Sequence, residues 1–291
     1  MNLSKLALGT ATFGMNYGTF NTSGQVKLNQ VQKIIEIALS KNIDTIDTAI
    51  CYGESEKVLG SVGLSDWKIV SKVPPNQDVT QTTRKWLYSQ VEKSLKRLKV
   101  AKLDGLLLHD PYQLGQFEGP EIWSCLNALK DEGLVSKIGY TIYESRELED
   151  LWEKFRPDII QAPLNLIDRR LIDSGWLDKL HYGGCEIHVR SIFLQGLLLS
   201  EFNDIPQFFK SWNPLWRRYR EWYKSEGITP LEACLTFAMS FPQISKIVIG
   251  IDSLIQFEEI LDCKVSNMKN FPRDISTDDK NLLNPSKWRI S

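Results

Sequence analysis

The chain has 291 residues, of which 42% are hydrophobic and 24% are charged. This balance is typical of a globular protein with a substantial core, and the length suits either one large domain or two small ones. The formal net charge is −1 and no block of basic residues is present, so composition gives no reason to expect a nucleic-acid partner or binding to an anionic membrane surface.

The cysteines and the first residues bear on location. Five cysteines are scattered without CxxC spacing, and an odd number of dispersed cysteines favours reduced thiols over a disulfide framework. The first residues lack the apolar run of a signal peptide, and no stretch approaches the roughly 18 apolar residues of a membrane span. We therefore expect a cytoplasmic protein with a small-molecule partner, and the sequence indicates no oligomeric state.

The predicted elements begin with a short strand at residues 6–10, followed by a loop rich in glycine and aromatic residues. Residues 29–41 then carry apolar side chains at the i, i+3, i+4, i+7 spacing of a helix with one buried face. The second strand covers residues 43–47 and leads through a polar loop into a short helix, for which Ser55 is the expected N-cap. Strand, loop and helix follow in this order, and the order repeats along the chain.

The third and fourth strands are predicted at residues 68–72 and 103–109. The fourth is continuously apolar, as expected where helices cover both faces of a sheet. A helix over residues 82–99 separates the two strands, and the next helix is expected to start at Pro120, because proline is favoured in the first turn.

The remaining strands are predicted at residues 135–141, 158–162, 186–191 and 246–250. The helix before the last strand carries the capping-box residues Thr229 and Glu232, and the final helix has the same pattern at Ser253 and Gln256. Eight successive βα units favour parallel pairing and, by their number, an α/β fold of the single-domain (β/α)8 TIM barrel type over residues 1–291. A doubly wound open sheet is the competing architecture.

One segment interrupts this regularity. Residues 201–227 are rich in aromatic side chains, among them Trp212 and Trp216, and we interpret them as a helical insertion in the loop after the seventh strand. A packed extra helix and a cover over the substrate are both compatible with this composition.

Four polar residues lie where such a barrel carries its active site, at the carboxyl ends of the strands. The second strand ends at Asp47 with Tyr52 in the following loop, the third ends at Lys72, and the fourth ends at His109. Each residue alone has a plain explanation as a turn, packing or solvated side chain. Four groups with complementary proton chemistry at the same end of three neighbouring strands instead favour a catalytic site.

The chemistry of these four groups suggests how they would cooperate. A free tyrosine has a pKa near 10, and we expect Lys72, held by Asp47, to lower the pKa of Tyr52 so that the phenol can act as a general acid. His109 would donate a hydrogen bond to a substrate oxygen and stabilise the negative charge that develops there. The hydride for such a reduction would have to come from a cofactor.

These motifs resemble those of the aldo/keto reductase superfamily. Residues 47–53, with the sequence DTAICYG, resemble the family signature D-T-A-x-x-Y-G, and residues 106–111 resemble its L-L-H-x-P segment. The similarity extends over residues 6–261, and the run RSIFLQG at residues 190–196 resembles bacterial members associated with sugars or surface-polysaccharide precursors. The resemblance implies a catalytic tetrad of Asp47, Tyr52, Lys72 and His109.

The resemblance further implies reduction of an aldehyde, ketone or sugar carbonyl, or the reverse oxidation, with an extended nicotinamide dinucleotide across the barrel mouth and no metal. It assigns cofactor contacts to Gly9, Thr10, Thr141, Gln161, Arg190, Ser191, Phe193, Gln195, Gly250, Asp252, Ser253 and Gln256. NADP is the family default. NAD or dual use is the alternative, because Gly250 and Gln256 stand where NADPH-selective members place basic residues.

Two other functions stay open beside the reductase. A strand-end lysine such as Lys72 could form a Schiff base in an aldolase. The chain could also be a cofactor-binding regulatory subunit with slow turnover, as a few members of the family are.

Overall fold

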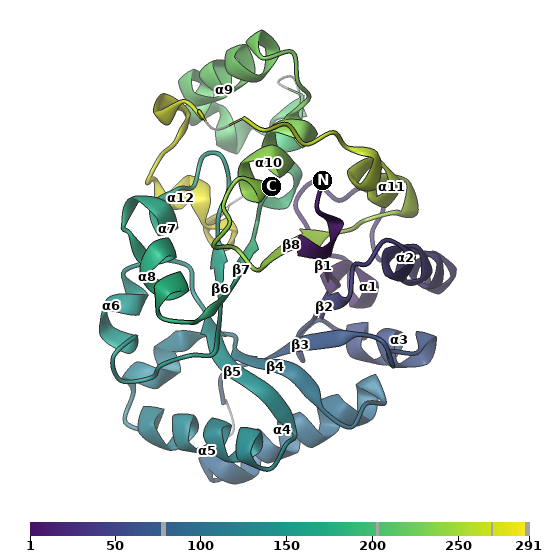
Figure 1. Cartoon of the computed structure of the whole chain (residues 1–291), viewed down its shortest axis with the longest axis vertical. Coiled ribbons are helices and arrows are strands. Elements are labelled where there is room, and N and C mark those ends of the chain that lie inside the picture. The colour runs from purple at the N-terminus through teal and green to yellow at the C-terminus, as the bar shows by residue number, and fades with distance from the viewer. Residues whose placement is uncertain (77–79, 202–203, 269, 289–291) are drawn as a thin grey trace.

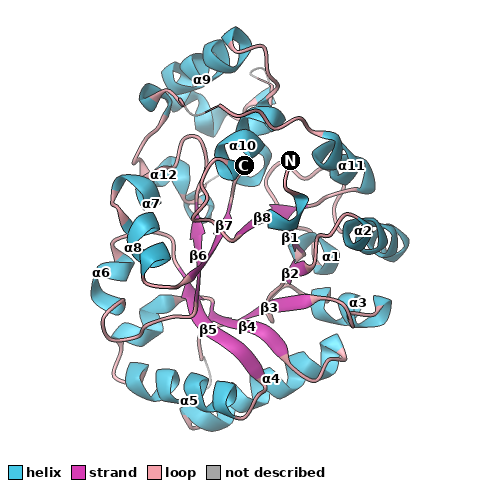
Figure 2. Cartoon of the chain, in the orientation of Figure 1, coloured by secondary structure: helices cyan, strands magenta, loops and turns pink. Residues whose placement is uncertain are grey.

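Eight parallel strands form a closed barrel in which each strand pairs with the next and β8 pairs with β1. In this computed structural model the described residues are 1–76, 80–201, 204–268 and 270–288. The strands surround the centre of the molecule and the helices lie outside them (Figure 2). The predicted TIM barrel is therefore confirmed, and the open-sheet alternative is wrong.

The strands agree with the predicted ranges to within two residues at either end. They are β1 (Leu6–Gly9), β2 (Thr45–Asp47), β3 (Lys68–Val73), β4 (Leu103–Leu108), β5 (Val135–Thr141), β6 (Ile159–Pro163), β7 (Glu186–Arg190) and β8 (Lys246–Gly250).

The helices follow the strands in sequence and form the outer layer (Figure 1). They are α1 (Ala11–Gly14), α2 (Leu28–Ser40), α3 (Ser55–Val62), α4 (Thr83–Leu98), α5 (Gly119–Asp131), α6 (Glu147–Leu151), α7 (Arg170–Asp173), α8 (Trp176–Tyr182), α9 (Asn213–Ser225), α10 (Pro230–Met239), α11 (Leu254–Asp262) and α12 (Lys280–Leu283).

The barrel interior is filled by apolar side chains from alternate strand positions. Val70, Leu107 and Ile159 form a buried cluster separate from the main core. Because side chains alternate along a strand, Lys72 lies on the same face of β3 as Val70. The ammonium group of Lys72 is therefore directed into the barrel, toward the end where the strands terminate.

The helix ends confirm one capping prediction and correct two others. Thr229 and Glu232 form the expected capping box at the start of α10. At α11, Ser253 accepts from the Gln256 backbone N–H, but the Gln256 side chain accepts from Asp252 N–H, so the second capping box is only half formed. Ser55 is not an N-cap: it is the first buried residue of α3, and its hydroxyl donates to the Thr10 carbonyl at 2.8 Å.

The aromatic residues of the 201–227 segment pack against the body of the protein. Within this segment α9 lies at the edge of the molecule in Figure 1, and the Trp216 indole donates to the Phe209 carbonyl at 2.9 Å. The Tyr219 hydroxyl donates to the Leu198 carbonyl at 3.1 Å. These contacts favour a packed extra helix. Residues 202–203 of this segment, and residues 289–291 of the predicted domain, lie outside the described residues.

Two further expectations concern cysteines and membranes. All five cysteines are unpaired, as their scattered placement predicts. Within the described ranges, every helix is too short or too polar to cross a lipid bilayer.

Candidate active site

The structure brings together the four residues predicted to form the tetrad. Lys72 Nζ donates to Asp47 Oδ1 at 2.6 Å and to the Thr48 carbonyl at 2.9 Å, and the two charged residues are only 1% and 3% exposed. The same Nζ lies 5.2 Å from the centre of the Tyr52 ring. His109 meets that ring edge-on, with 5.9 Å between the ring centres. A buried ion pair therefore lies beneath a phenol and an imidazole at the barrel mouth.

The loop that carries Tyr52 is fixed by close backbone contacts. Ile50 N–H donates to the Lys72 carbonyl at 3.0 Å, which ties the loop to β3. Gly53 adopts a positive φ of 56°, which favours glycine. A Cβ on Gly14 would lie 2.0 Å from the Tyr52 carbonyl oxygen. Only a glycine at position 14 lets the two loops approach this closely.

A buried carboxylate anchors the helix that follows this loop. Glu56 accepts from the hydroxyls of Ser71 at 2.8 Å and Ser94 at 2.6 Å, and from Arg97 Nε at 2.8 Å. Its charge is thus paired and hydrogen-bonded, as burial requires. These contacts bind α3 to β3 and α4, one residue from the strand position of Lys72. Sequence reasoning missed Glu56, because nothing local distinguishes it from a surface carboxylate.

The electrostatics of the mouth differ from the expectation for Tyr52. Burial, and then the negative charge of Asp47, raises the pKa of the Tyr52 phenol well above its usual value. The expected net lowering of this pKa is not found in this state, because burial is the largest cause and the charge of Asp47 acts in the same direction. Burial lowers the pKa of Lys72, opposed by Asp47. Burial and the nearby cations Lys72 and Arg190 lower the pKa of His109 to about 4. Both rings are therefore neutral near pH 7.

Thr141 and Gln161, two of the residues expected to contact the cofactor, are bonded to the tetrad. Gln161 Nε2 donates to Asp47 Oδ2 at 2.6 Å, and the Thr141 hydroxyl donates to the His109 carbonyl at 2.9 Å. This bond uses one of the two N–H donors of Gln161, so its second N–H and its amide oxygen remain for another partner. Both side chains therefore help to hold Asp47 and His109 in place.

Arg190 lies at the end of β7 and faces the same mouth. Its guanidinium donates to Ser191 Oγ at 3.2 Å and to the Ile142 carbonyl at 3.1 Å, and it stacks on the Tyr143 ring at 4.5 Å. Among the described residues no carboxylate forms an ion pair with it. Phe193, three residues on, is buried in the core, so its side chain is not presented to the mouth.

Gln195 connects two loops across the rim of the barrel. Its side-chain oxygen accepts from the Thr19 backbone N–H at 3.0 Å and from the Thr19 hydroxyl at 2.8 Å, and its Nε2 lies 3.5 Å from the Tyr17 hydroxyl. The Tyr17 ring is 6.5 Å from that of Tyr52. The loops after β1 and β7 are thus joined beside the tetrad.

The segments at β1 and β8 form the far side of the mouth. Gly9 pairs with both Asp47 and Gly250 in the barrel register, and Thr10 donates from its backbone and its hydroxyl to the Asp47 carbonyl, both at 3.0 Å. Gly250 is exposed, and a Cβ added at this position would have no other atom within 4 Å. Beyond it, Ser253 caps the N-terminus of α11. An open glycine turn before a helix N-terminus suits an anionic group such as a phosphate.

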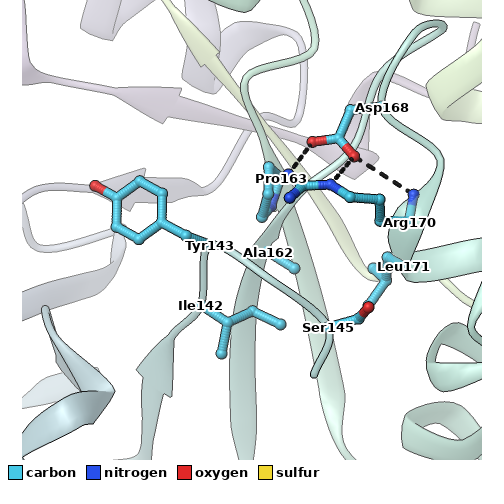
Figure 3. A pocket seen from close by; sticks show the side chains of 8 residues that line it. All are labelled: Ile142, Tyr143, Ser145, Ala162, Pro163, Asp168, Arg170 and Leu171. Atoms are coloured by element: carbon cyan, nitrogen blue, oxygen red, sulfur yellow. Dashed lines mark hydrogen bonds and ion pairs between the residues drawn. The ribbon is translucent and has the colours of Figure 1, made fainter. Parts of the chain in front are cut away.

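A small cleft lies beside this mouth, between the loops after β5 and β6 (Figure 3). Asp168 and Arg170 fill one side of it with two charge-assisted hydrogen bonds of 2.8 and 2.7 Å. The Tyr143 ring points away from this pair (Figure 3). The two charges of the pair neutralise each other. We therefore interpret the pair as a structural contact that holds the loop after β6 in place.

Cys51 is a further neighbour of the tetrad that sequence reasoning missed. Its Sγ lies 3.1 Å from His109 Nδ1. The signal available in the sequence was its position directly before Tyr52, in the loop that converges with the end of β4.

Comparisons with known proteins identify the family and support the fold. The model of the aldo/keto reductase family matches residues 5–269. Aflatoxin B1 aldehyde reductase member 2 of Rattus norvegicus is 25% identical, over 85% of this chain and 79% of the relative. Oxidoreductase sirO of Leptosphaeria maculans is 28% identical, over 67% of this chain and 61% of the relative. The holo form of aldo-keto reductase AKR11C1 from Bacillus halodurans is similar in fold, with a TM-score of 0.70 over 90% of this chain and 88% of that chain at 17% identity.

Proposed function

The chain belongs to the aldo/keto reductase family, and we propose that it reduces an aldehyde, ketone or sugar carbonyl with NAD(P)H, or runs the reverse oxidation, with Tyr52 as the general acid. The observation that carries this proposal is the buried Lys72–Asp47 pair beneath a neutral phenol and a neutral imidazole. Family membership supports an oxidoreductase that uses a nicotinamide cofactor and acts on carbonyl groups.

The residues divide the chemistry as follows. A bound reduced nicotinamide supplies the hydride. His109, neutral at pH 7, donates a hydrogen bond to the carbonyl oxygen, and Tyr52 gives its phenolic proton to that oxygen as negative charge develops there. Lys72 uses two of its three N–H donors on Asp47 and Thr48. The third remains to stabilise the phenolate that Tyr52 becomes.

The raised pKa of Tyr52 is compatible with this role. A phenol that stays protonated at neutral pH is always ready to donate, and an alkoxide is a far stronger base than a phenolate, so the transfer is downhill. In the reverse oxidation the phenolate is the required form. We therefore expect the reduction to be supported at pH 7 and the rate of the reverse oxidation to rise with pH.

The mouth contains groups that fit an extended dinucleotide. Arg190 presents a planar cation that is not ion-paired within the described residues, suited to a ring or an anionic group. At the other side, the N-terminus of α11 after Gly250 suits a phosphate. Residues 250–256 contain no basic side chain, and Asp252 is acidic. This composition supports use of NAD as well as the family default NADP.

The proposal is tested first by cofactor titration. Quenching of tryptophan fluorescence by NADPH or NADH should report binding to the wild type and to Tyr52→Phe alike. Turnover of Tyr52→Phe on a panel of aldehydes, ketones and sugars should fall by about 10²- to 10⁴-fold, the usual contribution of a positioned general acid. Tyr182→Phe, which alters a tyrosine that is 86% exposed, is the matched control and should retain full turnover.

Three outcomes would redirect the assignment. If neither dinucleotide binds at millimolar concentration, the reductase proposal is wrong. Cofactor binding with negligible turnover across the panel, together with a stable protein partner, would support the regulatory subunit. Trapping of a substrate on Lys72 by borohydride would support the aldolase, although burial of Lys72 and its bond to Asp47 weigh against nucleophilic attack.

A further inference from the structure

Cys51 contacts one of the two ring nitrogens of His109. Its Sγ is 3.1 Å from His109 Nδ1, within the range of a hydrogen bond to sulfur. The residue lies in the loop after β2, directly before Tyr52, and its side chain reaches across to the end of β4.

The protonation states of the two groups decide the direction of the bond. Cys51 is exposed as a residue, and the partial desolvation of its thiol raises the pKa, so the sulfur carries a proton near pH 7. His109 is neutral, with one ring N–H and one nitrogen lone pair. Sulfur is a weak acceptor, whereas an unprotonated imidazole nitrogen is a good one. The favoured arrangement is therefore S–H donating to Nδ1, which leaves the ring proton on Nε2.

Other contacts hold the backbone and the ring of His109, and they bear on which ring nitrogen faces Cys51. The His109 backbone N–H donates to the Val73 carbonyl at 2.9 Å, and the His109 carbonyl accepts from the Thr141 hydroxyl at 2.9 Å. The ring meets the Tyr52 ring edge-on at 79°. The Cys51 contact and the edge-on contact with Tyr52 favour the ring orientation in which Nδ1 faces Cys51. Only the tautomer of His109 decides whether Nε2 is a donor or an acceptor.

We propose that Cys51 is a positioning residue that holds His109 in the Nε2–H tautomer, so that the imidazole donates to the substrate carbonyl oxygen. The catalytic consequence rests on the proposed reductase function, whereas the tautomer is a property of the free protein. In the opposite tautomer Nε2 would present a lone pair to the carbonyl oxygen, and the interaction would be repulsive.

The tautomer can be read directly by NMR of protein labelled with ¹⁵N-histidine. The chain has three histidines, and loss of one signal set in His109→Asn assigns His109. We expect its Nε2 to resonate as a protonated nitrogen and its Nδ1 as an unprotonated one. Cys51→Ala should shift both signals toward values averaged over the two tautomers. Cys51→Ser, whose hydroxyl can still donate, should keep the wild-type pattern, and so should the remote control Cys263→Ala.

Single-turnover reduction then tests the consequence. Cys51→Ala should slow hydride transfer by roughly threefold to tenfold, the range that one neutral hydrogen bond commands, and Cys51→Ser should recover most of the loss. A wild-type proton on Nδ1, or an unchanged tautomer in Cys51→Ala, would overturn the inference. An unchanged rate in Cys51→Ala despite a changed tautomer would overturn its catalytic part. Failure of the wild type to bind either dinucleotide would instead defeat the reductase proposal and leave the NMR result standing.

Discussion

Asp47→Asn should destabilise the protein far more than its small change in volume suggests. Lys72 is 1% exposed and its ammonium is bonded to Asp47 at 2.6 Å, so the substitution leaves a buried charge without its counter-ion. An asparagine also brings an NH₂ group, and it cannot accept from both Lys72 and Gln161 as the two carboxylate oxygens do. Breaking a buried pair from one side costs about 3–5 kcal/mol. At about 2 °C per kcal/mol for a chain of this size, the melting temperature should fall by about 6–10 °C.

The pH dependence of this loss identifies Lys72 as its cause. Burial already lowers the pKa of Lys72, and removal of Asp47, whose charge raises it, should lower it further. Between that lowered value and the unfolded value of 10.5 the unfolded state binds more protons, so stability rises with pH across this window. The stability deficit of Asp47→Asn should therefore shrink from neutral pH toward about pH 10.

The assay is urea unfolding of the wild type and the variant at several pH values, followed by tryptophan fluorescence. Lys68→Met serves as the matched control. Lys68 and Asp44 form an ion pair of 2.7 Å, close in length to the 2.6 Å of Lys72 and Asp47, but it lies at the surface with the lysine side chain 56% exposed. Its loss should cost less than about 1 kcal/mol. A deficit for Asp47→Asn below 1 kcal/mol, or a pH slope equal to that of the wild type, would refute the claim that Asp47 holds Lys72 in its charged form.

Two further predictions concern the Tyr52 loop and the pH profile. The reduction rate should be flat from about pH 5 to about pH 9, because His109 titrates near a pKa of about 4 and burial raises the pKa of Tyr52 above its usual value; a group titrating near pH 7 in the kcat profile would contradict this. Gly14→Ala should cut turnover at least tenfold, since its Cβ would lie 2.0 Å from the Tyr52 carbonyl oxygen and displace the loop. Gly115→Ala, where a Cβ meets no atom within 4 Å, is the control, and equal activity of the two variants would count against the loop argument.

Periodicity and strand count predicted the barrel, and the barrel in turn predicted the meeting of the tetrad. Once β2, β3 and β4 are adjacent and parallel, residues at their carboxyl ends must share one mouth. What strand order cannot give is the choice of hydrogen-bond partner. Gln161 lies 114 positions from Asp47, and its amide could have faced a ligand, yet its Nε2 bonds the carboxylate.

The same limit applies to Ser55 and to the pKa of Tyr52. An N-cap pattern is local, but Ser55 is buried against Thr10 from a distant strand, and the tertiary contact decides its role. The raised pKa of Tyr52 depends on burial and on the nearby charge of Asp47, and both are properties of the assembled site.

The distribution of roles around the barrel has a consequence for engineering. The proposed proton-transfer groups lie within residues 47–109. Most of the proposed cofactor contacts lie at or after the carboxyl ends of β5 to β8. A half-barrel exchange could therefore import a new ligand preference while leaving the reaction chemistry in place. Gln161 is a tie across that boundary through its bond to Asp47, so a transplanted second half should keep a glutamine at this position of β6. The Thr141 hydroxyl crosses the same boundary to the His109 carbonyl, so the transplanted half should keep a threonine at this position of β5 as well.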